Sequence, residues 1–408
     1  MTLNRTAVLV VASGTVILAL SIGTRLTFGL FLQPMSATMG WGREVFAFAI
    51  ALQNLLWGAS QPFMGALSDR IGARKVIVVG GVGYAAGLYW MANAGSPLAL
   101  NLSAGLLVGL SLAATSFAVV LGAVGRAVSE EKRSMALGIA SAGGSMGQLA
   151  MLPVAQGFIG GFGWIGGLVG LGATAALMVP LAAAMSGRPA PHAGGAPEQK
   201  VGEALNEARG HKGFWFLTGG FFVCGFHVTF IGTHLPAYMV DNGLAASLGA
   251  VALTLIGAFN VLGSYMWGWL GGVYSKKMVL STIYLLRAVV ISLFLVVPVT
   301  APSVLVFAAA MGFLWLGTVP LTSGLVGQIF GVRYLSMLFG IVFFSHQLGA
   351  FLGVWLGGYL YDVTGSYDLV WYGAVALGLL SAALHWPIDE SPLARLAQQA
   401  QPEAEPAA

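Results

Sequence analysis

The sequence contains very little charge. Of its 408 residues, 8% are Asp, Glu, Lys or Arg, whereas 57% are hydrophobic. A soluble protein carries about 25% charged residues, so this composition excludes a chain that faces water on every side. No Asp or Glu lies deep inside any of the long apolar runs. The chain is therefore expected to meet lipid over much of its surface.

Cysteine is almost missing as well. Cys224 is the single cysteine, so no disulfide can form within the chain, and we expect it to be a small buried residue. The sequence shows no metal-ligand spacing, no nucleophile elbow and no phosphate-binding loop. We therefore expect no metal, no cofactor and no enzymatic activity. The net charge of +4 comes from loop lysines and arginines, and it does not imply a nucleic-acid partner.

Long apolar runs dominate what is present. A run of roughly 20 residues crosses a bilayer as a helix, and the runs do not alternate as barrel strands do. The first run follows Arg5 and is too long for a signal-peptide core, so we expect it to be retained. The runs cover residues 7–33, 43–66, 76–94, 98–124, 134–160, 163–186, 213–239, 245–271, 278–298, 302–327, 335–361 and 366–387.

This pattern predicts an all-α membrane protein with twelve transmembrane helices in two six-helix halves. The predicted units are a six-helix bundle over 1–186, a cytoplasmic linker over 187–212, a second bundle over 213–387 and a cytoplasmic tail over 388–408. The linker is polar and rich in Pro and Gly at first, and its composition allows a helix near 203–209.

The positions of the basic residues predict the orientation. Apart from Arg25, Arg43 and Arg287, all Lys and Arg residues fall at the N-terminus, in alternate loops, in the linker or in the tail. Basic loops stay in the cytoplasm. We therefore expect a multi-pass protein of the cell (inner) membrane with both termini in the cytoplasm.

The chain repeats itself with a shift of 202 residues. Gly23 then falls on Gly225, and the segment SM-x-x-GI at 134–139 falls on the same letters at 336–341. Two parallel six-helix halves are a transporter architecture, in which the substrate binds between the halves near the membrane midplane. In this register Arg25 and His227 are equivalent, and His234 lies two turns after His227 on nearly the same helix face.

An arginine inside a membrane helix is costly and usually faces a cavity or a partner. We expect Arg25 and His227 each to face the other's half across a central cavity and to contact the substrate. The alternatives are that Arg25 snorkels toward the outer surface and that the histidines are hydrogen-bonded packing residues.

The loop after the second run carries a recognisable motif. Residues 65–75 read GALSDRIGARK, which resembles the cytoplasmic signature G-x-x-x-D-R-x-G-R-K of the major facilitator superfamily. The resemblance implies a cytoplasmic gate formed by Asp69, Arg70 and Arg74. The second copy of this motif has Gly272 where an Asp would stand, so a gate formed by that copy would be weaker. The alternative for the first copy is a plain tight turn.

The entry to the fifth run narrows the resemblance. Residues 132–147 read KRSMALGIASAGGSMG, which is similar to the signature of the monocarboxylate transporters and the related oxalate/formate antiporters, bacterial type. Its small residues permit close helix packing. By alignment with animal members, Arg25 takes the place of a buried lysine near the substrate carboxylate. A guanidinium suits that task because it can bind both carboxylate oxygens.

Other family positions differ. The substrate-binding arginine of the eighth helix is replaced by Ser264, and an acidic residue one turn earlier is replaced by Asn260. The family's proton-coupled mechanism therefore does not transfer intact. Arg287, in the ninth run, could substitute for the missing cation or serve as a structural pair.

Two arginines, several histidines and no carboxylate make the interior positive, which favours an anion. We expect a secondary active transporter that moves a small organic anion, a monocarboxylate first, by alternating access, with proton symport or anion exchange. The alternative is an exporter or importer of a neutral or aromatic metabolite or drug. The candidate substrate-binding residues are Arg25, His227, His234, Thr229, Trp315 and Arg287. Because a histidine titrates near neutral pH, proton coupling would have to use His227, His234 or His346, and His227 and His346 are the first coupling candidates. The expected partners are the anion, protons and the lipid bilayer.

Overall fold

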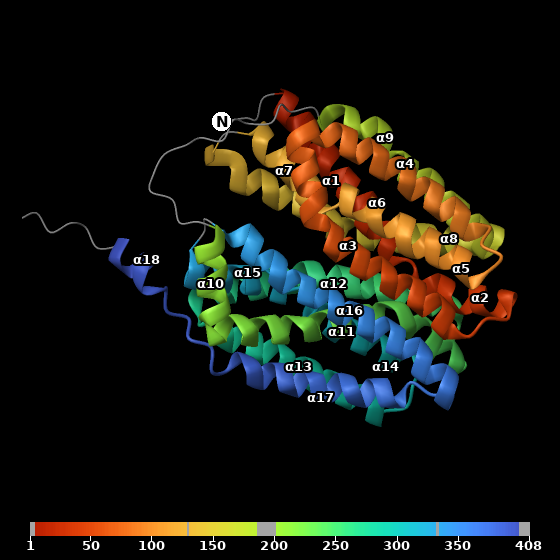
Figure 1. Ribbon diagram of the computed structural model, residues 1–408. Coiled ribbons are helices and arrows are strands. Elements are labelled where there is room, and N and C mark those ends of the chain that lie inside the picture. The colour runs from red at the N-terminus through yellow and green to blue at the C-terminus, as the bar shows by residue number, and fades with distance from the viewer. Residues whose placement is uncertain (1–4, 129, 186–200, 332–333, 400–408) are drawn as a thin grey trace, which may run out of the picture.

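The structure is a computed structural model that describes residues 5–128, 130–185, 201–331 and 334–399, and the regular elements in these ranges are all helical (Figure 1). The first half contains α1 (Arg5–Leu26), α2 (Gly29–Met39), α3 (Arg43–Ile71), α4 (Ala73–Ala92), α5 (Pro97–Leu100), the π-helical segment η1 (Asn101–Leu107), α6 (Val108–Thr115), α7 (Phe117–Ala127), α8 (Glu130–Ala176), α9 (Met178–Leu181) and the 3₁₀ segment η2 (Ala182–Met185). The second half contains α10 (Val201–Gly210), α11 (Lys212–Asp241), α12 (Ala246–Val273), α13 (Lys276–Val296), α14 (Ala301–Phe313), α15 (Thr318–Phe330), α16 (Leu335–Thr364), α17 (Asp368–His385) and α18 (Ala394–Gln399).

These helices make twelve membrane crossings. Ten helical stretches of the described chain are long and apolar enough to cross a membrane. One of them, Ala136–Met185, has 50 residues and is broken at Gly163, whose φ of 69° lies outside any right-handed helix, so it holds two crossings. The twelfth is α3, which is more polar because it carries Gln53 and Asn54 in its middle. The predicted all-α membrane fold is confirmed, and the described helices can supply all twelve predicted crossings.

Three crossings are interrupted inside the bundle. α1 ends at Leu26 and α2 begins at Gly29, α6 and α7 are separated by Ser116 in an extended conformation, and α14 and α15 are separated by residues 314–317. Irregular backbone at membrane depth is tolerated only where protein buries it or where it lines a cavity. These breaks therefore mark the interior positions at which function is expected.

The same glycine contacts pack the first and fifth crossings of each half. A Cβ on Gly147 of α8 would collide with the carbonyl oxygen of Ala19 on α1. In the second half, a Cβ on Gly349 of α16 would collide with the carbonyl oxygen of Phe222 on α11. Gly147 and Gly349 are related by the 202-residue shift. The motif at 132–147 thus acts as a close-packing surface, as its small residues predict.

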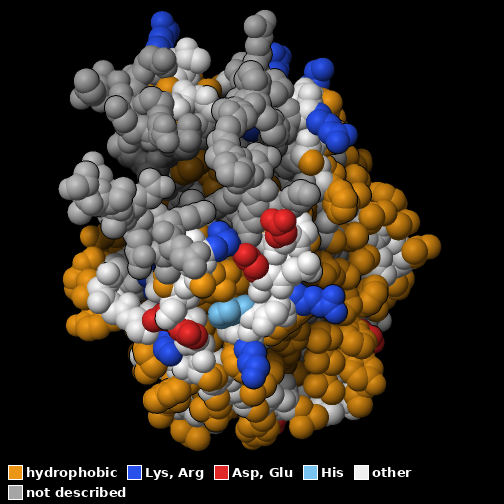
Figure 2. Space-filling view, turned by 60° about the vertical axis from the view of Figure 1, so that its left-hand side comes forward, with side chains coloured by type: hydrophobic (Ala, Val, Ile, Leu, Met, Phe, Trp, Pro, Cys, Tyr) orange, Lys and Arg blue, Asp and Glu red, His pale blue; other side chains and the backbone are white. Residues whose placement is uncertain are grey.

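The bundle has two chemically different ends. The N-terminus, α10 and α18 lie at one end, called the linker end, and the opposite end, called the far end, holds the loops at 40–42, 93–96, 242–245 and 297–300 (Figure 1). Among the described Lys and Arg residues at helix ends, Arg43 is the one at the far end. Figure 2 shows basic side chains around the linker end and hydrophobic side chains over the flank.

The linker and the tail are attached to the second half at the linker end. Arg395, just inside α18, forms an ion pair with Glu207 of α10, with Nε 2.9 Å from Oε1, and donates to the carbonyl of Phe330 at the end of α15 (2.7 Å). Of the expected linker, residues 187–200 lie outside the described residues, and α10 covers the segment where a helix was expected. The domain boundaries stay a prediction.

Candidate functional site

Arg25 lies in the last turn of α1, beside the first helix break. Its Nη2 donates to the Oδ1 of Asn54 on α3, and its guanidinium lies over the ring of Trp57, 5.0 Å from the centroid. The Nε of Arg25 is buried without a hydrogen-bond partner. The side chain points into the bundle toward α3, so it does not snorkel to a surface.

A second break brings polar groups to the same place. Ser116, between α6 and α7, accepts hydrogen bonds from the Nε1 of Trp57 (3.0 Å) and from the Nε2 of Gln61 (3.2 Å). We call Arg25, Asn54, Trp57, Gln61 and Ser116 the central polar cluster. Because an indole links Arg25 to Ser116, residues from three crossings of the first half form one polar surface.

The second half meets this cluster through α16. Gln347 donates from Nε2 to the carbonyl of Asn54 (3.1 Å), and Phe343 makes a T-shaped contact with Trp57, with 5.9 Å between the ring centroids. His346 stacks on Phe343 (5.5 Å between centroids) and its Nδ1 is 3.0 Å from the Oε1 of Gln347. The coupling candidate His346 therefore lies one residue away from the central polar cluster.

The other predicted residues lie elsewhere. His227 is fully buried inside the second half, where its Nε2 donates to the carbonyl of Ala374 on α17 (2.7 Å). Thr229 and Trp315 are also buried in the second half. His227 therefore bonds within its own half in this structure, and a substrate contact for His227, Thr229 or Trp315 stays a prediction.

Arg287 donates hydrogen bonds to the backbone of the third helix break, between α14 and α15. Its side chain is fully buried, and it donates from Nε and Nη2 to the carbonyl of Leu314 (3.0 and 2.7 Å) and from Nη2 to that of Trp315. Nη2 also lies 3.7 Å from the Sγ of the buried Cys224. The guanidinium thus supplies donors to the carbonyls exposed where α14 ends, which favours the structural alternative for this residue.

We expect Arg287→Met to lower the thermal stability of the detergent-solubilised protein by about 2 kcal/mol or more, because each buried carbonyl left without a donor costs about 1–3 kcal/mol. Thermal unfolding measures this loss. Arg287→Lys keeps the charge but not the fork of donors. The stability of this variant should therefore fall between that of Arg287→Met and that of the wild type. Equal stability of Arg287→Met and the wild type would contradict the role.

The predicted gate at the linker end is described only in part. Arg70 and Arg74 are exposed at the end of α3 and the start of α4, while the side chain of Asp69 lies outside the described residues. A gate formed by these three residues stays a prediction.

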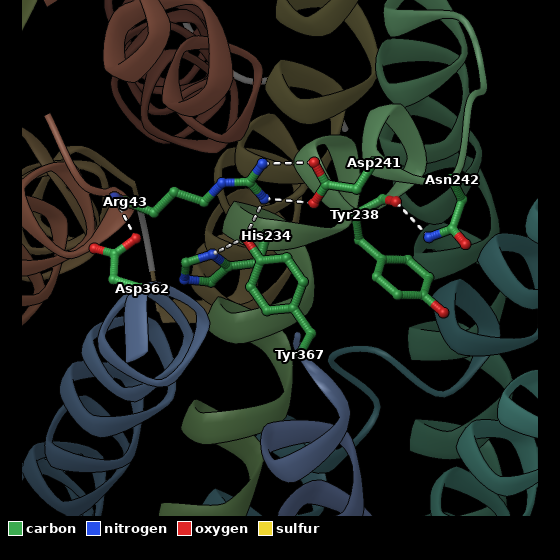
Figure 3. A network of polar contacts seen from close by, with 7 residues as sticks. All are labelled: Arg43, His234, Tyr238, Asp241, Asn242, Asp362 and Tyr367. Carbon is green, nitrogen blue, oxygen red and sulfur yellow. Dashed lines mark hydrogen bonds and ion pairs between the residues drawn. The ribbon is translucent and has the colours of Figure 1, made fainter. Parts of the chain in front are cut away.

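A polar network that the sequence did not predict closes the far end (Figure 3). Arg43, the first residue of α3, forms a two-pronged ion pair with Asp241 at the end of α11, with both N–O distances at 2.6 Å. Its Nη1 also donates to the hydroxyl of Tyr367 (2.9 Å). Asp362 of α16 accepts from the backbone N–H groups of Arg43 and Glu44 (2.9 and 2.8 Å). Three helix ends of the second half thereby hold the N-terminus of α3.

Two features strengthen this network. Asp362 places a negative charge at the N-terminus of α3, where the helix dipole favours it. Burial raises the pKa of the Tyr367 phenol above its usual range, so the hydroxyl keeps its proton and can donate as well as accept. His234 belongs here and not to the centre, since its Nδ1 lies 3.1 Å from the Tyr367 oxygen.

The contacts between α3 and α16 run from the far end to the centre. They begin at Arg43 and Asp362, continue through Phe48 and Phe351 (6.1 Å between centroids) and reach Trp57 and Phe343. The two halves are thus joined from the far end down to the level of Arg25. Among the described residues, no group of three His, Cys, Asp or Glu side chains could hold a metal ion.

The comparisons with known proteins agree with this architecture. The sequence profile of the Major Facilitator Superfamily matches residues 11–270 and 241–407. The chain is 30% identical over 376 residues to monocarboxylate transporter 11 of Mus musculus, covering 88% of this chain and 82% of that protein. It is 25% identical over 384 residues to the uncharacterized MFS-type transporter YcxA of Bacillus subtilis (strain 168), covering 88% and 90%.

Two solved structures share the fold. A bacterial homolog of the human lysosomal transporter Spinster, in an inward-facing and occupied conformation, has a TM-score of 0.76 at 15% identity and covers 92% of this chain and 95% of its own. A mutant of the nucleoside transporter NupG has a TM-score of 0.74 at 12% identity and covers 92% and 98%. The chain belongs to the Major Facilitator Superfamily, as a multi-pass membrane transporter and not an enzyme.

Proposed function

We propose that this secondary transporter moves a small organic anion, a monocarboxylate first, by alternating access. The observation that carries the proposal is Arg25, whose contacts in the described structure are the neutral side chains of Asn54 and Trp57. A half-buried cation without a carboxylate partner is costly inside a membrane. A substrate carboxylate would supply the missing charge, and the unpaired Nε of Arg25 offers it a donor.

The rest of the central polar cluster suits this role. It lies at the boundary of the two halves, where α3 meets α16 through Asn54 and Gln347. A ligand bound there would contact both halves and could favour one arrangement over the other. The 30% identity to a protein named a monocarboxylate transporter also supports a carboxylate substrate.

A neutral or aromatic metabolite is the second candidate substrate. The observation that favours it is the set of rings beside Arg25, in which Trp57 contacts Phe343 and Phe343 stacks on His346. An aromatic wall of this kind could hold a planar ligand.

We also propose that the linker end faces the cytoplasm of the inner membrane, since the basic helix ends gather there. The far end then faces outward, and the network around Arg43 is its closed gate. Transport would be coupled either to protons or to a counter-anion.

The test of the substrate class is thermal stabilisation of the purified protein by a panel of small mono- and dicarboxylates, with matched amines and neutral analogues. A ligand at about 100 times its Kd adds about 2.7 kcal/mol of stability. We expect carboxylates alone to raise the unfolding temperature. Stabilisation by neutral aromatic compounds and by no carboxylate would favour the second candidate and overturn the anion proposal.

A further inference from the structure

His234 is the buried titratable group nearest to the far-end gate. It lies on α11 with 1% of its surface exposed, and its Nε2 is 2.8 Å from the carbonyl oxygen of Val354 on α16. A carbonyl oxygen can only accept, so Nε2 must carry a proton. In the neutral imidazole Nδ1 is then an acceptor, and the hydroxyl of Tyr367 donates to it across 3.1 Å.

This assignment fixes the direction of a chain of hydrogen bonds. Arg43 donates from Nη1 to the Tyr367 oxygen (2.9 Å), and Tyr367 donates onward to His234. The same Arg43 guanidinium donates to both carboxylate oxygens of Asp241. Since Arg43 belongs to the first half and the other residues to the second, the chain crosses the boundary that must open at this end (Figure 3).

A proton on Nδ1 is incompatible with this chain. The imidazolium has two N–H donors and no acceptor, so Tyr367 would lose the partner to which it donates. The added charge on the buried imidazole would also lie one hydroxyl group away from the Arg43 guanidinium, whose side chain is only 12% exposed. Two cations so close together repel. Separation of the halves, which admits water, relieves both problems.

We propose that His234 is a proton-binding site of the transporter and that its protonation opens the far-end gate. The proposal rests on the proposed function, in which this end opens during transport. It gives the protein a route to proton coupling that needs no carboxylate within the membrane. His234 acts on the gate through Tyr367, so it is a positioning residue for Arg43.

Other charged and titratable groups face the same site. They are Arg43 and Glu44 on α3, Tyr238 and Asp241 on α11, Tyr361 and Asp362 on α16, and Tyr367 and Asp368 at the start of α17. Carboxyl, phenol and guanidinium groups ordinarily titrate outside the range between about pH 5 and 8, in which imidazole titrates. A response of the gate within that range therefore points to an imidazole, and His234 is the histidine that is hydrogen-bonded to Tyr367 of the gate.

The test is a distance across the far end, measured between spin labels in the full chain without substrate. One label replaces Gly95, where a side chain meets nothing within 4 Å, and the other replaces the exposed Ala246 at the start of α12. The native Cys224 is fully buried. The state that binds the proton gains population as pH falls. We expect the ratio of long to short distances to rise between about pH 8 and about pH 5, by at most about tenfold per pH unit, the limit for one linked proton.

His234→Gln should remove this pH response, because glutamine does not titrate. Tyr367→Phe, which leaves the pair of Arg43 and Asp241 in place, should weaken it, because the link between His234 and Arg43 is lost. The matched control is His385→Gln, since His385 is a fully buried histidine bonded to the carbonyl of Ser381 (2.7 Å) on α17. The distance between the labels in His385→Gln should respond to pH as it does in the wild type.

Two results would overturn the proposal. The first is a distance between the labels of the wild-type protein that does not change with pH. The second is a pH response that stays unchanged in the His234→Gln variant, provided that this variant unfolds at the wild-type temperature. Neither depends on the substrate, because none is added. If the gate responds through His234 while no carboxylate stabilises the protein, the substrate proposal fails and the proton site stands.

Discussion

Arg25→Gln is expected to lower the affinity for the substrate carboxylate by about 100-fold or more and to abolish its transport. A charge-assisted hydrogen bond contributes about 1.5–3 kcal/mol, and a guanidinium can make two of them to one carboxylate. A loss of about 3 kcal/mol corresponds to about two orders of magnitude in Kd. Glutamine removes the charge while it keeps a polar side chain at this position.

The measurement combines thermal stabilisation by the best carboxylate of the panel with its uptake into proteoliposomes. Arg25→Lys should keep part of the affinity, because the ammonium preserves the charge but lacks the fork. Lys75→Gln is the matched control, since it removes one positive charge from an exposed position at the linker end. Wild-type affinity and uptake in Arg25→Gln would contradict a role of Arg25 in binding and make it a structural residue.

The same assay tests the sequence-based prediction for His227. In the structure His227 lies inside the second half and bonds to Ala374, away from Arg25. We expect His227→Gln to leave carboxylate affinity within a few-fold of the wild type. A loss comparable to that of Arg25→Gln would mean that the second half turns this residue toward the substrate at another stage of transport.

The number of crossings and the two-half design could be predicted because they depend on composition and periodicity. Apolar runs of the required length and a fixed 202-residue register are visible without any contact between distant residues. The helix breaks could not be predicted in the same way. Ser116 sits within an apolar run, and nothing adjacent to it in the sequence distinguishes an extended residue from a helical one.

The central site could be predicted only in part, for a related reason. The repeat makes Arg25 and His227 equivalent in sequence, but α1 ends one residue after Arg25 whereas α11 runs unbroken through His227. Equivalent positions therefore point to different neighbours, Asn54 on α3 in one half and Ala374 on α17 in the other. Asn54 did carry a signal, since it is a polar residue in the middle of an apolar run.

The far-end gate depends on residues that the sequence separates widely. Arg43 and Asp241 are 198 residues apart, and each stands at the end of an apolar run in the sequence. Pairing across the two halves is a property of one conformation of the transporter. Periodicity and motifs report on single helices, so they do not contain this information.

Gly147→Ala is expected to lower stability strongly and Gly138→Ala to leave it almost unchanged, although both glycines belong to the same motif on α8. A Cβ on Gly147 would collide with the carbonyl oxygen of Ala19, whereas a Cβ on Gly138 meets nothing within 4 Å. Overpacking costs about 1–3 kcal/mol and sometimes more, and a backbone atom cannot rotate away. We expect a loss of at least about 3 kcal/mol for Gly147→Ala, because α1 must move away from α8.

Alanine at position 138 should leave stability unchanged or raise it by up to about 1 kcal/mol, since alanine is the better helix former. The second half offers the same contrast, with Gly349 against the carbonyl of Phe222 and Gly340 in open space. The four variants are Gly147→Ala, Gly138→Ala, Gly349→Ala and Gly340→Ala. Their unfolding temperatures and their yields of monodisperse protein report on the packing of each half separately. Equal unfolding temperatures for Gly147→Ala and Gly138→Ala would show that close approach of the helices is not what this motif provides. If alanine is destabilising at 147 and 349 but not at 138 and 340, each half keeps its own packing surface between its first and fifth crossings. Such a surface keeps each half rigid while the two halves move around the site at Arg25.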